Sequence, residues 1–292
     1  GKTHKVDDGF TENMQRISES HPNSPMAEKY GTNRTAKDKR TFDTVKKRTS
    51  VGKAHNMNNI AKEYRPGQLV TKIKPVTDHQ KQVFESWKKG QNQFLFGCAG
   101  TGKTFVSLYL ALQDVLKNEM PQDKVVVVRS LIPTREIGFL PGDEEDKAAL
   151  YQVPYSNMMQ FMFEQPNEQA FSMLYDRLKA QGSFYFMSTS FLRGLTFDNA
   201  IIIVDECQNL NFHELDTIIT RVGQDSKIIF CGDFGQTDLT RTAEKNGLMN
   251  FLQILQEMQE FNCCEFDIGD IVRSGFVRNY LIQKTNLGLG IE

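Results

Sequence analysis

A glycine-rich segment at residues 97–104 has the pattern G-x-x-x-x-G-K-T and lies between an apolar run and a helix-like run. Glycines let backbone N–H groups converge on phosphate oxygens, and the following helix presents its positive end to the same anion. Lys103 would reach the terminal phosphates and the Thr104 hydroxyl would ligate Mg²⁺. We therefore predict nucleotide binding; the alternative is a glycine-rich turn with a chance Lys-Thr pair. The predicted phosphate-binding residues are Gly97, Cys98, Ala99, Gly100, Thr101, Gly102, Lys103 and Thr104.

An acidic pair, Asp205 and Glu206, follows four β-branched residues at 201–204. Such a run is typical of a strand buried on both faces of a parallel sheet, and ligands bind at the carboxyl ends of these strands. We expect Asp205 to hold Mg²⁺ and Glu206 to orient or deprotonate an attacking water. The pairing favours hydrolysis of a nucleotide over phosphoryl transfer by a P-loop kinase. The alternative is two solvated acids that close a strand.

A third apolar run, residues 228–231, is followed by the segment G-D-F-G-Q. A polar amide just past a strand end can hydrogen-bond the γ-phosphate or the attacking water. We predict this role for Gln236, although the segment taken alone is also compatible with an ordinary turn. No N-K-x-D signature is present, which argues against a GTPase.

The charge of the chain is unevenly distributed. Residues 1–75 hold 16 Lys and Arg against 8 Asp and Glu, and residues 76–292 hold 19 against 28, although the net charge is only −1. The polar, basic residues 1–70 predict a poorly ordered, flexible segment. The alternative is a basic arm that contacts nucleic-acid phosphates. We assign residues 71–292 to one folded domain.

Five cysteines without metal-binding spacing predict free thiols and a reducing cytoplasm. No apolar run approaches the roughly 20 residues that span a membrane, so we expect no membrane partner. Apolar periodicity predicts strands and helices that alternate along the chain. The predicted strands are residues 93–96, 125–128, 184–187, 201–204, 228–231 and 264–268. The predicted helices are residues 78–89, 105–116, 147–163, 168–180, 213–221, 248–260 and 275–285.

This alternation predicts an α/β fold, a parallel sheet with helices on both faces. We expect the helices at 147–163 and 168–180 to form an insertion. Residues 72–285 resemble the PhoH family of ATPases, which are related to superfamily 1 helicases, and phage-type members in particular. The motifs that carry the resemblance are residues 97–104, 137–142 (I-G-F-L-P-G), 193–196 (R-G-L-T), 203–209 (I-V-D-E-C-Q-N), 232–236 (G-D-F-G-Q) and 270–273 (D-I-V-R).

The resemblance implies a RecA-like core that hydrolyses ATP with Mg²⁺, couples to RNA or single-stranded DNA and forms a homo-oligomeric ring, a hexamer in the family. It also implies a bacterial or phage-infected host cytoplasm. Cys98 and Cys207 replace residues that are more often Pro and Ala in the family, and we expect the chemistry to survive. No carboxylate pattern of a PIN ribonuclease is visible, so we expect no nuclease activity.

The resemblance also implies roles for residues outside the three motifs. Arg273 would act on the γ-phosphate from an adjacent subunit, with Arg278 as a second candidate; for both, the alternative is a surface salt bridge. Gln80 would contact the adenine edge or would simply be solvated. Nucleic-acid contacts are expected at Arg129, Ser130 and Arg135, and for Arg129 a structural hydrogen bond is the competing interpretation.

The predicted catalytic residues are thus Lys103, Glu206, Gln236 and Arg273. The sequence favours an ATPase that remodels or moves along nucleic acid. A different class remains open, in which an ATP-dependent switch or scaffold acts on a protein partner without translocation. Because the folded domain is acidic and nucleic-acid affinity normally rests on Lys and Arg clusters, stimulation of ATP hydrolysis by RNA or single-stranded DNA would separate the two.

Overall fold

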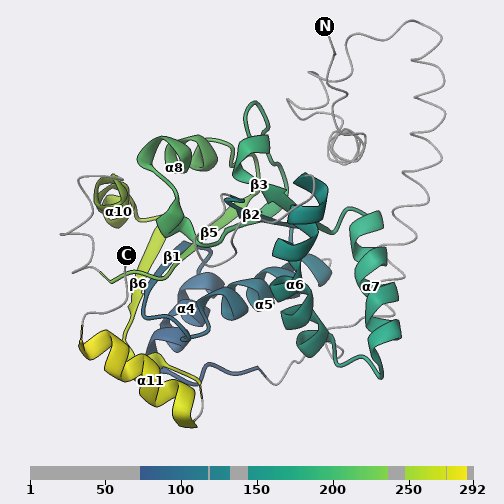
Figure 1. Ribbon diagram of the computed structural model, residues 1–292. Coiled ribbons are helices and arrows are strands. Elements are labelled where there is room, and N and C mark those ends of the chain that lie inside the picture. The colour runs from purple at the N-terminus through teal and green to yellow at the C-terminus, as the bar shows by residue number, and fades with distance from the viewer. Residues whose placement is uncertain (1–72, 118, 132–143, 236–246, 274, 288–292) are drawn as a thin grey trace, which may run out of the picture.

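The structure, a computed structural model, describes residues 73–117, 119–131, 144–235, 247–273 and 275–287, with the side chains of residues 144–147 excepted (Figure 1). The predicted basic segment at residues 1–70 lies outside this part of the chain. Six parallel strands form one sheet in the order β3-β2-β4-β5-β1-β6. They are β1 (Asn92–Gly97), β2 (Lys124–Arg129), β3 (Phe184–Ser188), β4 (Ala200–Val204), β5 (Lys227–Gly232) and β6 (Phe261–Phe266).

Helices cover both faces of the sheet (Figure 1). On one face lie α4 (Asp78–Lys88), α5 (Lys103–Leu116), α6 (Glu144–Phe163) and α7 (Glu168–Ala180); on the other lie α8 (Phe212–Ile219) and α10 (Leu248–Glu257). Successive strand residues alternate between the two cores, because side chains of a strand point to opposite faces. Ile203 packs with α5, for example, and its neighbour Ile202 packs with α10. The predicted α/β fold is therefore confirmed.

The helices at 147–163 and 168–180 are not an insertion, and this prediction was wrong. They correspond to α6 and α7, which form the crossover between the parallel neighbours β2 and β3. Parallel strands cannot be joined by a hairpin and need such a connection. Tyr155 and Met159 of α6 and Leu174 of α7 are buried in the core on the α5 side of the sheet.

The bounds of all the predicted strands and helices agree with the structure to within three residues. The last predicted strand, residues 264–268, is displaced along the chain from the observed strand, because β6 begins three residues earlier, at Phe261. A final helix, α11 (Gly275–Asn286), carries no buried residue. Three short 3-10 helices complete the described elements: η1 (Thr189–Phe191), η2 (Cys207–Asn209) and η3 (Ile268–Asp270).

The sheet order brings three strand ends together. β5 pairs with both β1 and β4, so the carboxyl ends of β1, β4 and β5 lie side by side at one edge. The phosphate-binding motif follows β1, the acidic pair follows β4, and Asp233 follows β5. Residues separated by more than a hundred positions in the chain therefore meet at this edge.

Gly97 is required where β1 meets β6. Its φ is +118°, and a Cβ atom there would lie 2.0 Å from the carbonyl oxygen of Phe266 on β6. We predict that Gly97→Ala lowers the free energy of unfolding by about 2 kcal/mol or more beyond the effect of Gly90→Ala. Gly90 is the matched control, since its φ is also positive (+87°) but nothing lies within 4 Å of a Cβ there. Urea unfolding followed by circular dichroism measures both; equal losses would show that β6 yields to the added methyl group.

Candidate active site

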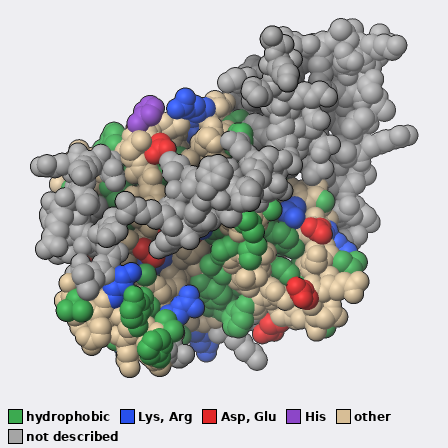
Figure 2. All heavy atoms as spheres, viewed as in Figure 1, with side chains coloured by type: hydrophobic (Ala, Val, Ile, Leu, Met, Phe, Trp, Pro, Cys, Tyr) green, Lys and Arg blue, Asp and Glu red, His purple; other side chains and the backbone are tan. Residues whose placement is uncertain are grey.

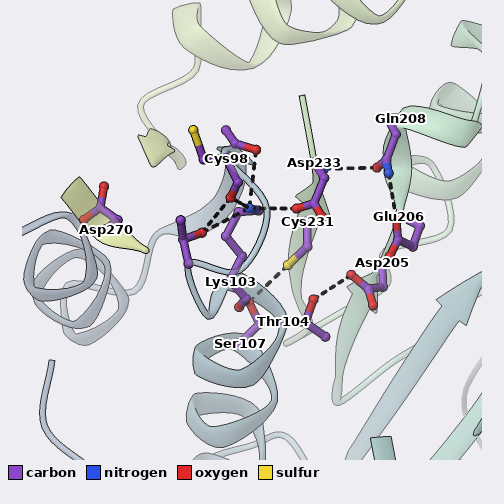
Figure 3. Close-up of polar contacts among 12 residues, drawn as sticks. Cys98, Lys103, Thr104, Ser107, Asp205, Glu206, Gln208, Cys231, Asp233 and Asp270 are labelled. Atoms are coloured by element: carbon purple, nitrogen blue, oxygen red, sulfur yellow. Dashed lines mark hydrogen bonds and ion pairs between the residues drawn. The ribbon is translucent and has the colours of Figure 1, made fainter. Parts of the chain in front are cut away.

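The segment at residues 97–104 contains the end of β1, the loop at residues 98–102 and the start of α5 (Figure 3). Gly100 and Gly102 adopt positive φ angles of 74° and 82°, which favour glycine over residues with a Cβ atom. Gly102 is the N-cap of α5, and no side-chain hydrogen bond caps this helix. The first N–H groups of a helix lack partners within the helix and attract anions. The loop therefore has the backbone geometry that a bound phosphate requires.

Lys103 is the first residue of α5, and its ammonium group is almost fully buried. Its Nζ donates to the carbonyl oxygen of Cys98 at 2.6 Å and to the Thr101 hydroxyl at 3.1 Å, and lies 2.8 Å from Oδ1 of Asp233. A buried ammonium needs such partners to offset its lost hydration. Asp233 is half-exposed and directly follows β5. The sequence analysis missed it as a site residue, although an acidic residue directly after a buried strand could have indicated it.

The structure brings Thr104 and Asp205, the two predicted metal ligands, into contact. The Thr104 hydroxyl donates to Oδ1 of Asp205 at 2.9 Å. Burial raises the pKa of Asp205, and hydrogen bonds from Tyr155 and Thr104 counteract that effect. Hydroxyl and carboxylate oxygens are the ligands that Mg²⁺ prefers. These two residues therefore fit a magnesium ion bound beside the phosphate loop.

Glu206 adopts a left-handed conformation, with a φ of 54°. Its Oε2 accepts a hydrogen bond of 2.6 Å from Gln208, and Oε1 of Gln208 accepts from the N–H of Asp233 at 3.2 Å (Figure 3). Burial, followed by the charges of Asp205 and Asp233, raises the pKa of Glu206. A carboxylate with a raised pKa is a better proton acceptor. Gln208 was not singled out from the sequence, although it lies within the acidic motif.

Arg129 lies near the acidic pair. Burial lowers the pKa of its guanidinium, but electrostatic interactions with Tyr155, Glu206 and Asp205 outweigh this effect and raise the pKa. The guanidinium lies 5.2 Å from the centre of the Tyr151 ring. This placement favours the structural interpretation of Arg129, and its contact with nucleic acid stays a prediction. Tyr155 was not found from the sequence, because only the packing of α6 brings it to the site.

Gln80 supports the phosphate loop. Its Nε2 donates to the carbonyl oxygen of Thr101 at 3.1 Å, and its Oε1 accepts from the N–H of Val76 at 3.0 Å. The side chain is buried rather than solvated. Both ends of the amide are thus engaged within the chain, and the proposed adenine contact stays a prediction.

The segment before Arg273 is attached to the same loop. The N–H of Val272 donates to the carbonyl oxygen of Gly100 at 3.1 Å. A Cβ atom on Gly100 would lie 3.3 Å from Cγ of Arg273 and 3.0 Å from a methyl group of Leu281 on α11. Arg273 therefore lies beside the phosphate loop of its own chain.

Four further predicted residues remain. Ser130 is buried just beyond β2, and Arg278 lies exposed on α11. Arg135 and Gln236 lie outside the described residues.

In the part of the chain that the structure describes, no helix is long and apolar enough to cross a membrane.

The charge of Glu206 is expected to lower stability. Because burial raises its pKa above the ordinary value of 4.5, the folded protein disfavours the ionised form. We predict that Glu206→Gln raises Tm by roughly 2–4 °C at pH 8. The gain is fully present above the folded pKa and vanishes below the unfolded one, because there both states carry a neutral carboxyl.

Thermal unfolding at several pH values measures this effect. Glu260→Gln removes an exposed carboxylate of the same kind and serves as the control. A Glu206→Gln protein with an unchanged or lower Tm at pH 8 would contradict the expected repulsion within the acidic cluster.

This chain is similar to known proteins over most of its length. The family model described as "PhoH-like protein" matches residues 72–283. A PhoH-like protein from Synechocystis is 33% identical over 215 residues, which are 73% of this chain and 62% of that protein. Protein PhoH from Escherichia coli is 31% identical over 64% of this chain and 51% of its own length. The chain thus spans about half to two thirds of these relatives.

Among solved structures, the large terminase from a thermophilic bacteriophage is similar with a TM-score of 0.44 and 13% identity, over 72% of this chain and 50% of the terminase. The Sulfolobus solfataricus SWI2/SNF2 ATPase core in complex with double-stranded DNA gives a TM-score of 0.39 and 13% identity, over 74% of this chain and 59% of that one. The family match covers most of the chain and includes the phosphate loop, the acidic pair and Arg273. The chain belongs to the PhoH-like protein family.

Proposed function

We propose that this protein is a Mg²⁺-dependent ATP hydrolase. The observation that carries the proposal is the contact between Thr104 and Asp205, which joins the phosphate loop to the acidic pair. Glu206, the next residue, supplies a carboxylate with a raised pKa at the same edge of the sheet. Family membership supports the same activity.

Each residue has a distinct role in the proposed reaction. Backbone N–H groups within residues 99–104 would bind the phosphates, and Lys103, released from Asp233, would neutralise their charge. Thr104 and Asp205 would hold Mg²⁺, which when bound neutralises charge that develops on the phosphate oxygens. Glu206 accepts a proton from the attacking water, and Gln208 fixes the orientation of its carboxylate.

We further propose that hydrolysis is coupled to RNA or single-stranded DNA. The excess of Lys and Arg in residues 1–75 supports binding to phosphate backbones. The second candidate is a switch or scaffold that acts on a protein partner, and the acidic charge of residues 76–292 favours it.

We also propose that the protein forms an oligomeric ring, a hexamer by resemblance to the family. The exposed surface of α11 supports this proposal. Hydrophobic side chains gather over this helix on the face shown in Figure 2. In α11, Phe276 is 84% exposed and Tyr280 is 57% exposed. Exposed apolar patches of this kind mark protein interfaces. They lie on the helix that contacts the phosphate loop through Leu281, so an interface here would adjoin the nucleotide site.

Steady-state ATP hydrolysis with and without single-stranded RNA and single-stranded DNA at low salt tests the function. We predict that Lys103→Ala reduces turnover at least about a hundredfold while the fold is retained, because the phosphate charge loses its buried partner. Lys81→Ala, at an exposed position of α4, is the control. Stimulation by one polymer would support the nucleic-acid motor, whereas unstimulated hydrolysis would favour the switch or scaffold. Equal rates for Lys103→Ala and the wild type would contradict the proposed site.

Arg273→Ala should reduce kcat by roughly a hundredfold or more and leave ATP binding intact, since an arginine at the γ-phosphate acts mainly in the transition state. The proximity of Arg273 to its own Gly100 supports action within one chain over the contribution between subunits that the sequence suggested. Mixing Arg273→Ala with Lys103→Ala separates the two models. Recovered activity in the mixture would show that the arginine comes from a neighbouring subunit. Normal hydrolysis by Arg273→Ala alone would show that Arg273 has no role in the reaction.

A further inference from the structure

Tyr155 of α6 reaches the Asp205 carboxylate at the oxygen that Thr104 does not contact. Its side chain is 1% exposed, and its hydroxyl donates to Oδ2 of Asp205 at 2.7 Å. Thr104 donates to the other oxygen, Oδ1. The two oxygens of Asp205 are therefore held by hydroxyl groups from two different helices, α5 and α6.

Tyr155 also lies near a cation. Arg129, at the end of β2, interacts electrostatically with Tyr155, Glu206 and Asp205. Its guanidinium lies 5.2 Å from the centre of the ring of Tyr151, one turn earlier in α6. A cation and a carboxylate thus both act on the Tyr155 hydroxyl, which favours one orientation of its hydrogen bond to Asp205.

We propose that Tyr155 is a positioning residue of the ATPase site, which orients Asp205 for the metal and makes α6 part of the metal-binding apparatus. The inference rests on the proposed function in one respect, namely that Asp205 binds Mg²⁺. Partners of a ligand carboxylate fix its orientation, and their loss typically weakens metal binding or activity 10- to 100-fold. Mg²⁺ is especially sensitive, because it demands nearly ideal octahedral geometry.

A purely structural role for the hydroxyl makes a different prediction. A buried Tyr hydroxyl needs a partner wherever it lies, and its removal would then change stability alone. The position of Tyr155 on α6 favours a role in orienting Asp205 in addition to a role in packing. α6 belongs to the crossover between β2 and β3, and a displacement of this helix would act on the Asp205 carboxylate through one hydrogen bond.

The test is Tyr155→Phe, which removes one oxygen atom and keeps the ring. Tyr175→Phe is the matched control, because its partly buried hydroxyl donates to Gln152 and joins α7 to α6 instead of reaching Asp205. The probe is the fluorescent nucleotide mant-ATPγS, titrated with EDTA and then across a range of Mg²⁺ concentrations. Tm is measured for every variant to confirm the fold, and Tyr155→Met, which also lacks the donor, replaces Tyr155→Phe if that variant does not fold.

Mg²⁺ is expected to strengthen nucleotide binding, and the Mg²⁺ concentration at half of this effect is the measured quantity. For Tyr155→Phe we expect this concentration to rise roughly tenfold or more. Nucleotide binding in EDTA should stay within about twofold of the wild type, and Tyr175→Phe should match the wild type in both measurements. In an Asp205→Asn background, Tyr155→Phe should add no further loss, since the charged acceptor is already gone.

An unchanged Mg²⁺ dependence in Tyr155→Phe would overturn the proposal, and so would an equal loss of binding in EDTA. This test measures nucleotide binding and does not depend on hydrolysis. If the wild-type protein binds nucleotide with Mg²⁺ but does not hydrolyse ATP, the proposed ATPase function is refuted and the test of Tyr155 remains valid. A wild-type protein whose nucleotide binding ignores Mg²⁺ would overturn the metal site and the role of Tyr155 together.

Discussion

The buried carboxylate of Asp205 is the constraint on which the site depends. A charge removed from water must be compensated by hydrogen bonds and by charge of the opposite sign. Thr104, Tyr155 and Arg129 supply these from α5, α6 and β2. Hydrogen bonds therefore tie α5 and the crossover helix α6 to the two oxygen atoms of this carboxylate, and the charge of Arg129 links β2 to it electrostatically.

The same edge of the sheet contains several features that reduce stability. Glu206 combines a left-handed backbone with a carboxylate next to two other acids, and Lys103 is a buried ammonium. Each feature is unfavourable for an isolated fold and useful for binding a charged ligand, a combination expected at functional sites. Asp233 moderates the cost, because it pairs with Lys103 and its own N–H donates to the Gln208 side chain.

Much of the fold could be predicted from the sequence because its signals are local. Runs such as 125–128 and 201–204 consist of β-branched residues, and a strand buried on both faces needs such residues at every position. The phosphate loop was equally local, since its glycines and its Lys-Thr pair are adjacent in the chain. The crossover of α6 and α7 could not be recognised, because an apolar helix pattern does not reveal which surface the helix covers. Gln208 and Asp233 were visible as residues, but their shared hydrogen bond depends on the order of β4 and β5.

The sequence by itself determined the parallel α/β fold, the phosphate loop and the acidic pair, because these depend on residue types at short spacing. Only the tertiary structure decided the partners of those groups. Arg129 and Gln80 are polar residues that a sequence can assign equally well to a ligand or to solvent; the structure directs one to Asp205 and Glu206 and the other to the loop carbonyl of Thr101. Tyr155 carries no motif, and it meets Asp205 across 50 residues only because β2, β3 and β4 lie side by side beneath α6. Such contacts arise from the packing of the chain as a whole, which no local pattern encodes.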